Sequence, residues 1–241
     1  MRYVNVLFLF IVIPALGQTA IPDSSFAQLA KQQAIRTYEQ AMTRQEHIYE
    51  GNEYISHDHR IKVHPYYPID SLLSGTIAYN GATYHDVRML YDIVHDEVSV
   101  QPPEGAYRLR LHPEKVGRFS IGQHQFIRLA GAGDSTSSLP TGFYEVLYNG
   151  KTDVLAHRVK TVHEDISSGA YKAEYLIKDR FYVQKKGMYE EVKTKRSVLS
   201  LFPDQAKALR RYIRTNNIKF KEESREAAIT GVVRQYDDLT H

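Results

Sequence analysis

The feature that most constrains the fold is a series of short runs of β-branched and aromatic residues, separated by turn residues, between Gly75 and Val192. Runs of this length and composition predict β-strands. The pair Asn80-Gly81 separates two of them, and Asn-Gly is a strong hairpin signal because both central residues of its turn need positive φ. Because parallel strands need long crossover connections, strands joined by such tight turns favour an antiparallel sheet.

Two more turn signals divide the same region. Asn149-Gly150 predicts a second hairpin of the same kind, with Gly150 at positive φ. Lys186-Gly187 predicts a turn into a further strand, Met188–Val192. In each turn we expect the glycine to supply backbone freedom that a side chain would restrict.

Helical periodicity is present on both sides of this region. Apolar residues recur at three- and four-residue spacing from Phe26 to Met42 and predict a helix that ends near Arg44. After Val192 the same spacing predicts two helices, the second with Ser224 as its N-cap. The apolar positions of these two helices are Phe202, Ala206, Leu209 and Ile213, then Ile229, Val232, Val233 and Tyr236.

These patterns predict an α+β fold: an antiparallel, twisted β-sheet meander, forming a half-barrel or sandwich, with one N-terminal helix and two C-terminal helices. We divide the chain into a signal peptide at 1–17, with cleavage as late as residue 20, and a single α+β domain at 18–241. Within that domain, 18–60 hold the N-terminal helix and an irregular segment, 61–193 the β-rich core, and 194–241 the C-terminal helices.

The first seventeen residues have the composition of a secretory signal peptide. A basic start at Arg2 is followed by an apolar run from Val4 to Ile13 and by small residues at Ala15 and Gly17. The run is shorter than the ~20 residues that span a bilayer, so we expect cleavage and a mature chain without a transmembrane segment. The expected location is periplasmic or secreted.

Composition excludes several classes of site and partner. The chain has 0 Cys, which excludes disulfides, thiol catalysis and Cys-ligated metals. Hydrophobic residues make up 42% and charged residues 24%, so we expect a folded core rather than disorder. We expect no cofactor.

Positive charge is concentrated in residues 172–221, which hold fourteen Lys or Arg against five Asp or Glu, although the whole chain has a net charge of only +3. Such asymmetry marks either a surface for an anionic partner or a solvated helix face. The candidate binding residues are Lys207, Arg210, Arg211 and Arg214. The partners we expect are an anionic envelope component, either lipid or polysaccharide, or another envelope protein, and no nucleic acid.

A histidine-rich segment is the candidate metal site. His57 and His59 would project to one face of an extended segment, and His64 follows them. Two imidazoles and a third ligand can hold zinc with one position open, although the spacing here matches no named zinc motif. The alternative is a polar loop with solvated histidines.

A second polar cluster, at Asp92, His95, Asp96 and Glu97, ends a predicted strand. Carboxylates and a histidine perform acid–base chemistry when they share a cleft. Aspartate also ends strands because its side chain stabilises turns, and we favour that interpretation.

Several stretches of the chain resemble a group of uncharacterised exported proteins of Bacteroidetes-type bacteria. The likeness covers about residues 60–240 and rests on the residues of the predicted strands and turns at 75–84, 87–93, 142–151 and 181–187. The resemblance implies an exported bacterial protein, and it carries no activity or catalytic residue.

From the sequence we expect an exported, non-enzymatic binding or interaction protein of the bacterial envelope. Two alternatives stay open. One is a carrier of a lipid or another apolar ligand, which a large apolar pocket between sheet and helices would favour. The other is a metal-dependent hydrolase that uses the histidines at 57–64.

Overall fold

The computed structural model describes residues 24–42, 47–61, 63–131, 139–165, 167 and 172–240. The predicted signal peptide at 1–17 lies outside these described residues. The chain divides into two compact units, Met1–Met42 and Thr43–His241.

Helix α1 (Ser24–Met42) is the described part of the first unit. It confirms the N-terminal helix and ends two residues before the predicted Arg44. All the side chains described on it, at positions 27–37, are exposed, including Leu29 and Ile35. Across the described chain, no helix is both long and apolar enough to cross a membrane.

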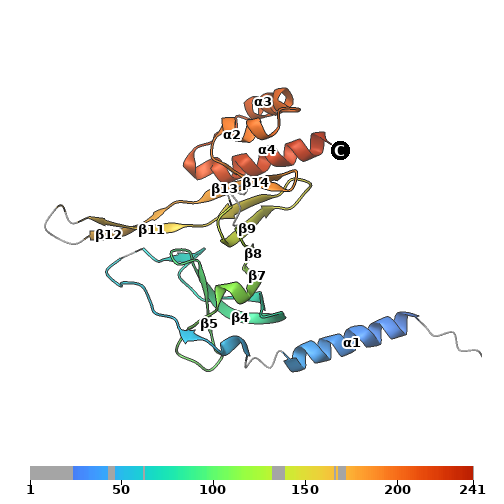
Figure 1. The fold of residues 1–241 in the computed structure, drawn as a ribbon, viewed down its shortest axis with the longest axis vertical. Helices are drawn as coiled ribbons and strands as arrows, with labels where there is room; N and C mark the ends of the chain where they lie inside the picture. Colours follow the sequence, from blue (N-terminus) through green and yellow to red (C-terminus); the bar gives the residue numbers. More distant parts are fainter. Residues whose placement is uncertain are drawn as a thin grey trace, which may run out of the picture. The chain divides into compact units, whose positions relative to one another are not determined.

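The second unit is built on antiparallel strands (Figure 1). The strands are β1 (Asn52–Glu53), β2 (Tyr66–Tyr67), β3 (Leu73–Tyr79), β4 (Ala82–Asp92), β5 (Glu97–Gln101), β6 (Leu109–Arg110), β7 (Val116–Ile121), β8 (His124–Leu129), β9 (Gly142–Tyr148), β10 (Val154–His157), β11 (Lys160–Asp165), β12 (Lys172–Ile177), β13 (Arg180–Lys185) and β14 (Met188–Val192). The helices are η1 (His47–Tyr49), η2 (Pro113–Lys115), α2 (Lys195–Leu201), α3 (Ala206–Thr215), η3 (Glu222–Ser224) and α4 (Arg225–Leu239).

One large sheet runs through this unit. Its 12 strands follow the order β1-β6-β5-β4-β3-β7-β8-β9-β10-β13-β14, with β2 paired to β4, while β11 and β12 form a separate two-stranded ribbon. In the described chain β1 and β14 are the two ends of this order, so the sheet is open. The structure therefore confirms the predicted α+β fold with an antiparallel meander.

All three predicted turns join strands that pair antiparallel, and two of the three have the glycine backbone that the sequence predicts. Asn80 and Gly81 have φ of 49° and 83° between β3 and β4, and Lys186 and Gly187 have φ of 54° and 81° between β13 and β14. The hairpin predicted at Asn149-Gly150 is present, because β9 and β10 pair antiparallel, but the predicted positive φ of Gly150 is wrong. A glycine is required at this position instead because neighbouring side chains lie too close to leave room for a Cβ atom.

Two side chains lie close to Gly150. A Cβ atom at this position would lie 2.5 Å from Tyr148 Oη and 2.6 Å from Asp237 Oδ2. Tyr148 belongs to β9 and Asp237 to α4. The glycine thus lets the loop between β9 and β10 pass close under the last helix.

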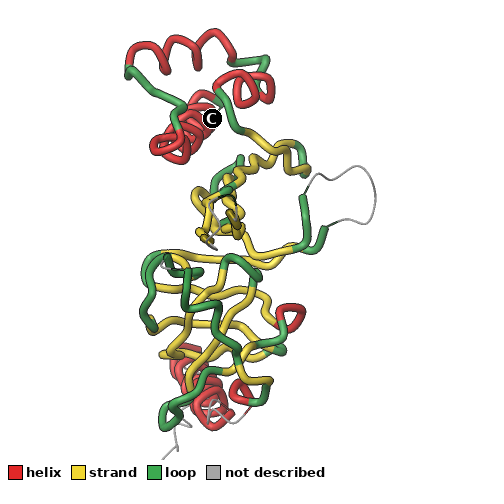
Figure 2. The backbone as a smooth tube through the Cα atoms, turned by 90° about the vertical axis from the view of Figure 1, so that its left-hand side faces the viewer, coloured by secondary structure: helices red, strands yellow, loops and turns green. Residues whose placement is uncertain are grey.

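Two large hydrophobic cores occupy the two halves of this unit, and two smaller clusters, one around Tyr144 and one around Tyr54, accompany them. The first contains an aromatic cluster of Tyr91, Phe119, Phe126 and Phe143, whose neighbouring ring centroids lie 4.7–5.9 Å apart. The second lies between the C-terminal helices and strands β10, β13 and β14. In Figure 2 the yellow strands curl through one half, while the red helices next to the C-terminus cover the other.

The C-terminal segment forms three α-helices rather than the predicted two. Helix α2 starts with a capping box between Thr194 and Ser197 and ends at Leu201. Phe202 leaves helical geometry because Pro203 follows it, and the residue before a proline is pushed out of the α region. Ser224 does precede α4 as predicted, but its side chain makes no capping hydrogen bond.

The C-terminal helices bury most of the apolar positions that their sequence spacing predicts. The second core contains Leu209 and Ile213 of α3, Ile229 and Val233 of α4, and Phe202, which directly follows α2. The ring of Tyr236 is partly buried and stacks on Phe202 at a centroid distance of 4.0 Å. The amphipathic spacing read from the sequence therefore identified the buried face correctly.

An ion-pair network lies between the two cores. Arg158 is 5% exposed, and its guanidinium nitrogens lie 2.5 Å from Glu145, 2.8 Å from Asp179 and 2.7 Å from Glu226. The other carboxylate oxygen of Glu145 lies 2.5 Å from His124. The guanidinium group of Arg158 therefore links strand β9, the loop before β13 and helix α4. Glu145 extends the network to His124 on β8.

Candidate functional site

The exposed face of α3 is strongly basic. Of its ten residues, Lys207, Arg210, Arg211 and Arg214 are cationic and none is acidic. All four side chains are exposed, while Leu209 on the opposite face is buried. We call these four residues the basic face. All four candidate binding residues therefore lie outside the second core.

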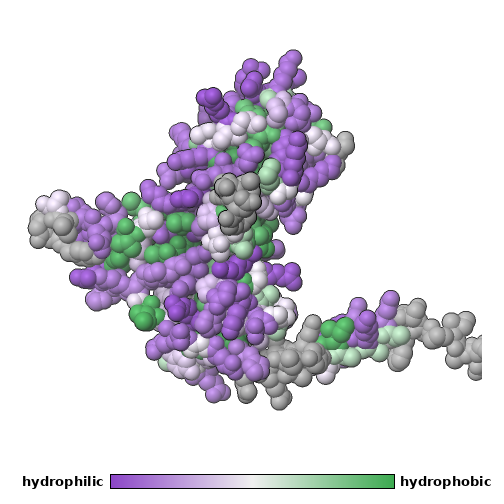
Figure 3. All heavy atoms as spheres, viewed as in Figure 1, coloured by the Kyte–Doolittle hydropathy of each residue, from purple (hydrophilic) through white to green (hydrophobic). Residues whose placement is uncertain are grey.

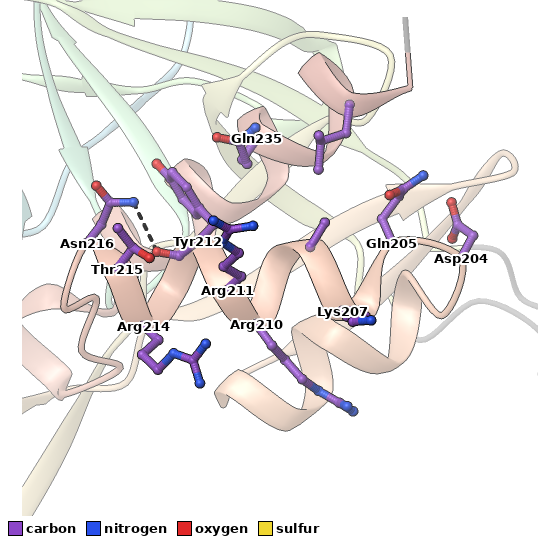
Figure 4. Close-up of a pocket in the computed structure, with 12 residues that line it drawn as sticks. Asp204, Gln205, Lys207, Arg210, Arg211, Tyr212, Arg214, Thr215, Asn216 and Gln235 are labelled. Atoms are coloured by element: carbon purple, nitrogen blue, oxygen red, sulfur yellow. Dashed lines mark hydrogen bonds between the residues drawn. The ribbon is translucent and has the colours of Figure 1, made fainter.

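Two surface hollows lie on either side of α3. The first, of about 750 Å³, lies between α3 and α4 and is lined by all four residues of the basic face together with Tyr212 and Gln235. Figure 4 shows Arg210 and Arg214 projecting from one side of α3, with Arg211 nearer to Tyr212 and Gln235. The second hollow, of about 680 Å³, is lined by residues of α2 and α3, including Lys195, Arg196 and Arg210. Arg210 therefore contributes to both.

The charges of the basic face are not neutralised within the described chain. None of the four residues takes part in an ion pair there. Asp204, which lines the first hollow, lies instead 3.4 Å from Lys185. Hydrophilic side chains cover much of the surface around α2, α3 and α4 (Figure 3). An anion that entered the first hollow would therefore meet unpaired positive charge.

The histidines predicted as metal ligands do not converge. His59 is exposed, and the ring of His64 stacks against Tyr66 with centroids 6.3 Å apart. His57 instead meets Asp92 and His95. Of the residues that the structure describes, these three alone form a group of three or more His, Cys, Asp or Glu whose ligand atoms all lie within 4.8 Å of one another.

Asp92 is the centre of this second site. It ends β4, and its Oδ1 accepts hydrogen bonds from the backbone N–H groups of Val94 (2.9 Å) and His95 (3.2 Å). These bonds close the turn into β5, as favoured from the sequence. Its Oδ2 lies 2.6 Å from His57 Nε2 and 3.0 Å from His95 Nδ1, and it accepts a 2.9 Å bond from the Tyr54 hydroxyl.

The other two members of the predicted acidic cluster have different partners. Asp96 accepts hydrogen bonds from the Tyr91 hydroxyl at 2.6 Å and from the backbone N–H of Phe143 at 3.1 Å. Glu97 lies 3.2 Å from Arg110. Asp92 and His95 thus have different contact partners from Asp96 and Glu97.

Burial and hydrogen bonding set the ionisation of this site. Burial acts to raise the pKa of Asp92, but the His57 and Tyr54 hydrogen bonds outweigh it, so this pKa lies below its usual value. Burial also raises the pKa of Tyr54 well above its usual range. Nearby, burial lowers the pKa of Lys160, whose ammonium donates to the backbone carbonyl groups of His64 and Tyr66. Asp92 is accordingly a carboxylate at neutral pH.

Comparison of the chain with protein-family models, with curated proteins and with solved structures gave no match.

Proposed function

We propose that this chain is an exported, non-enzymatic binding protein of the bacterial envelope, and that the basic face of α3 binds an anionic partner. The observation that carries the proposal is the concentration of four unpaired cations beside a hollow of about 750 Å³. The signal-peptide composition of residues 1–17 supports export.

The arrangement of the four cations costs stability in the free protein. Lys207 and Arg211 are four residues apart, as are Arg210 and Arg214. Like charges at this spacing destabilise a helix by about 0.2–0.5 kcal/mol per pair. A bound polyanion would relieve that repulsion, which an ordinary solvated face avoids by mixing charges of both signs.

The chemistry of the partner follows from the shape of the site. Three guanidinium groups favour phosphate or carboxylate, which they bind through paired hydrogen bonds. Both anionic lipid headgroups and acidic polysaccharides present these groups repeatedly. The hollows are open to the surface of α2, α3 and α4, as such an extended partner requires.

Co-sedimentation with vesicles tests the proposal. We expect the protein to bind phosphatidylglycerol-containing vesicles or alginate at physiological salt, to ignore phosphatidylcholine vesicles, and to bind less well as salt is added. The double change Arg210→Glu and Arg211→Glu should weaken binding by about thirtyfold or more, because each basic residue at an anionic surface contributes about 1 kcal/mol.

A matched control is the double change Arg88→Glu and Arg118→Glu. Both arginines are exposed on strands β4 and β7, so the net charge changes equally while α3 is untouched. Equal losses in both double variants would contradict a specific site, and so would the absence of binding by the parent protein to either polyanion.

The carrier alternative depends on space between sheet and helices. That interface is filled by side chains of the second core, among them Val154, Val183 and Val198. The described residues therefore offer this alternative no specific support.

A further inference from the structure

We propose that His57, Asp92 and His95 form a binding site for one divalent transition-metal ion, such as zinc. Neutral imidazole nitrogens and a carboxylate oxygen are the ligands that zinc and similar ions take in proteins. The site lies at the β4–β5 turn and does not depend on the basic face of α3, so each proposal stands or fails alone.

The three ligand atoms already point to one place. His57 Nε2 and His95 Nδ1 both approach the same oxygen, Asp92 Oδ2, at 2.6 Å and 3.0 Å. The two imidazole rings stack with their centroids 4.4 Å apart and their planes 23° apart. An ion placed between the two nitrogens and this oxygen would meet three donors of suitable type.

Two of the three ligands, Asp92 and His57, are oriented by contacts at an atom other than the proposed donor atom. The backbone N–H groups of Val94 and His95 hold Asp92 Oδ1, so Oδ2 faces the two histidines and the Tyr54 hydroxyl. Tyr175 Oη lies 2.8 Å from the remote ring nitrogen of His57. Metal-binding histidines are generally oriented by such a contact at their second nitrogen. The sequence does not reveal the Tyr175 contact, because the two residues are 118 positions apart.

The depth of the site suits an ion that retains a water ligand. The side chain of Asp92 is fully buried, that of His57 is 10% exposed and that of His95 is 54% exposed. An ion would therefore enter from the His95 side and keep an open position towards solvent, as zinc sites with three protein ligands do.

Binding requires only a small movement. Ligands of a tetrahedral zinc ion lie about 3.3 Å from one another, given zinc–ligand distances near 2.0 Å. The present separations of 2.6 Å and 3.0 Å from Asp92 Oδ2 are slightly shorter. His95 lies in an exposed turn and is the ligand that can move outward.

Zinc titration of tag-free, chelator-treated protein tests the site, with a chromophoric chelator as competitor. We expect one equivalent of zinc, and we expect cobalt to give a visible absorption band of a nitrogen- and oxygen-ligated ion. His95→Ala should weaken zinc binding by about tenfold or more, since even the loss of an orienting partner costs that much. Because His95 is half exposed, this variant should fold normally, which its circular dichroism would verify.

The control is the double change His59→Ala and His64→Ala, which removes two histidines of the same segment but none of the three ligands. It should bind zinc as the parent protein does. The proposal is overturned if the parent binds less than a tenth of an equivalent, or if the control loses binding as His95→Ala does. In either case Asp92 acts only as a hydrogen-bonding centre of the turn.

Discussion

At the scale of single residues, the same dipeptide serves two different purposes. Asn80-Gly81 occupies a tight turn whose backbone needs positive φ, whereas Gly150 is required because Tyr148 and Asp237 approach it closely. The sequence predicts the first purpose, because turn chemistry is local. It does not predict the second, because Asp237 comes from a helix near the other end of the domain.

Three alanine substitutions separate these purposes. Gly81→Ala and Gly150→Ala should each destabilise by about 1 kcal/mol or more, the first through backbone strain and the second through a steric clash. Gly231→Ala should stabilise by up to about 1 kcal/mol, because its helical position has open space. Thermal melts measure all three. A Gly150→Ala variant as stable as the parent would show that the close approach is unimportant.

The candidate metal ligands show how far single residues can be predicted. His57, Asp92 and His95 all stand out in the sequence, but in two separate clusters. They meet because β2 pairs with the end of β4 and so returns the preceding segment to the β4–β5 turn. Short-range spacing holds no record of that pairing. The only local signal is Asp92 at the end of a predicted strand, because aspartate side chains often accept hydrogen bonds from the backbone of the turn that follows.

At the scale of helices and strands, the sequence predicts the type of an element better than the residues at which it begins and ends. The strands and the amphipathic face of α3 follow from periodicity, since burial on one face is a local pattern. The sequence does not predict the boundary between α2 and α3, because Phe202 fits the apolar spacing of α3. In the structure Phe202 lies in the connection between the two helices and packs into the second core from there. Its neighbour Pro203 was the signal for this boundary.

Helix α3 should depend on its buried face for its position. Leu209→Asp should destabilise the second unit severely, because it places an unpaired charge in a fully buried position. Ala208→Asp provides the control, since Ala208 is partly exposed on the same helix. Urea unfolding followed by circular dichroism measures both. Similar midpoints for the two variants would contradict the docking of α3.

At the scale of the whole second unit, two cores share one continuous sheet. Strand β9 places Phe143 in the first core and packs Leu147 and Tyr148 against the second. Arg158 adds a polar connection between Glu145 on β9 and Glu226 on α4. The two halves are therefore expected to unfold together.

Removing the central charge of this network should be costly. Arg158→Met leaves the buried carboxylate of Glu145 without its guanidinium partner, and breaking a buried pair in this way costs about 3–5 kcal/mol. Glu226→Gln should cost less than about 1 kcal/mol, because Glu226 is 45% exposed. Denaturant titration compares the two free energies of unfolding. Equal losses in the free energy of unfolding would contradict a central role of Arg158 in the network.

The sharing of β9 also dictates an order of events for a chain that emerges from its N-terminus. The aromatic cluster of the first core includes Phe143, which follows every other ring of that cluster along the chain. Until β9 has emerged, Tyr91, Phe119 and Phe126 lack one of the rings that enclose them. The aromatic cluster of the first core can therefore be completed only after more than half of the chain has emerged.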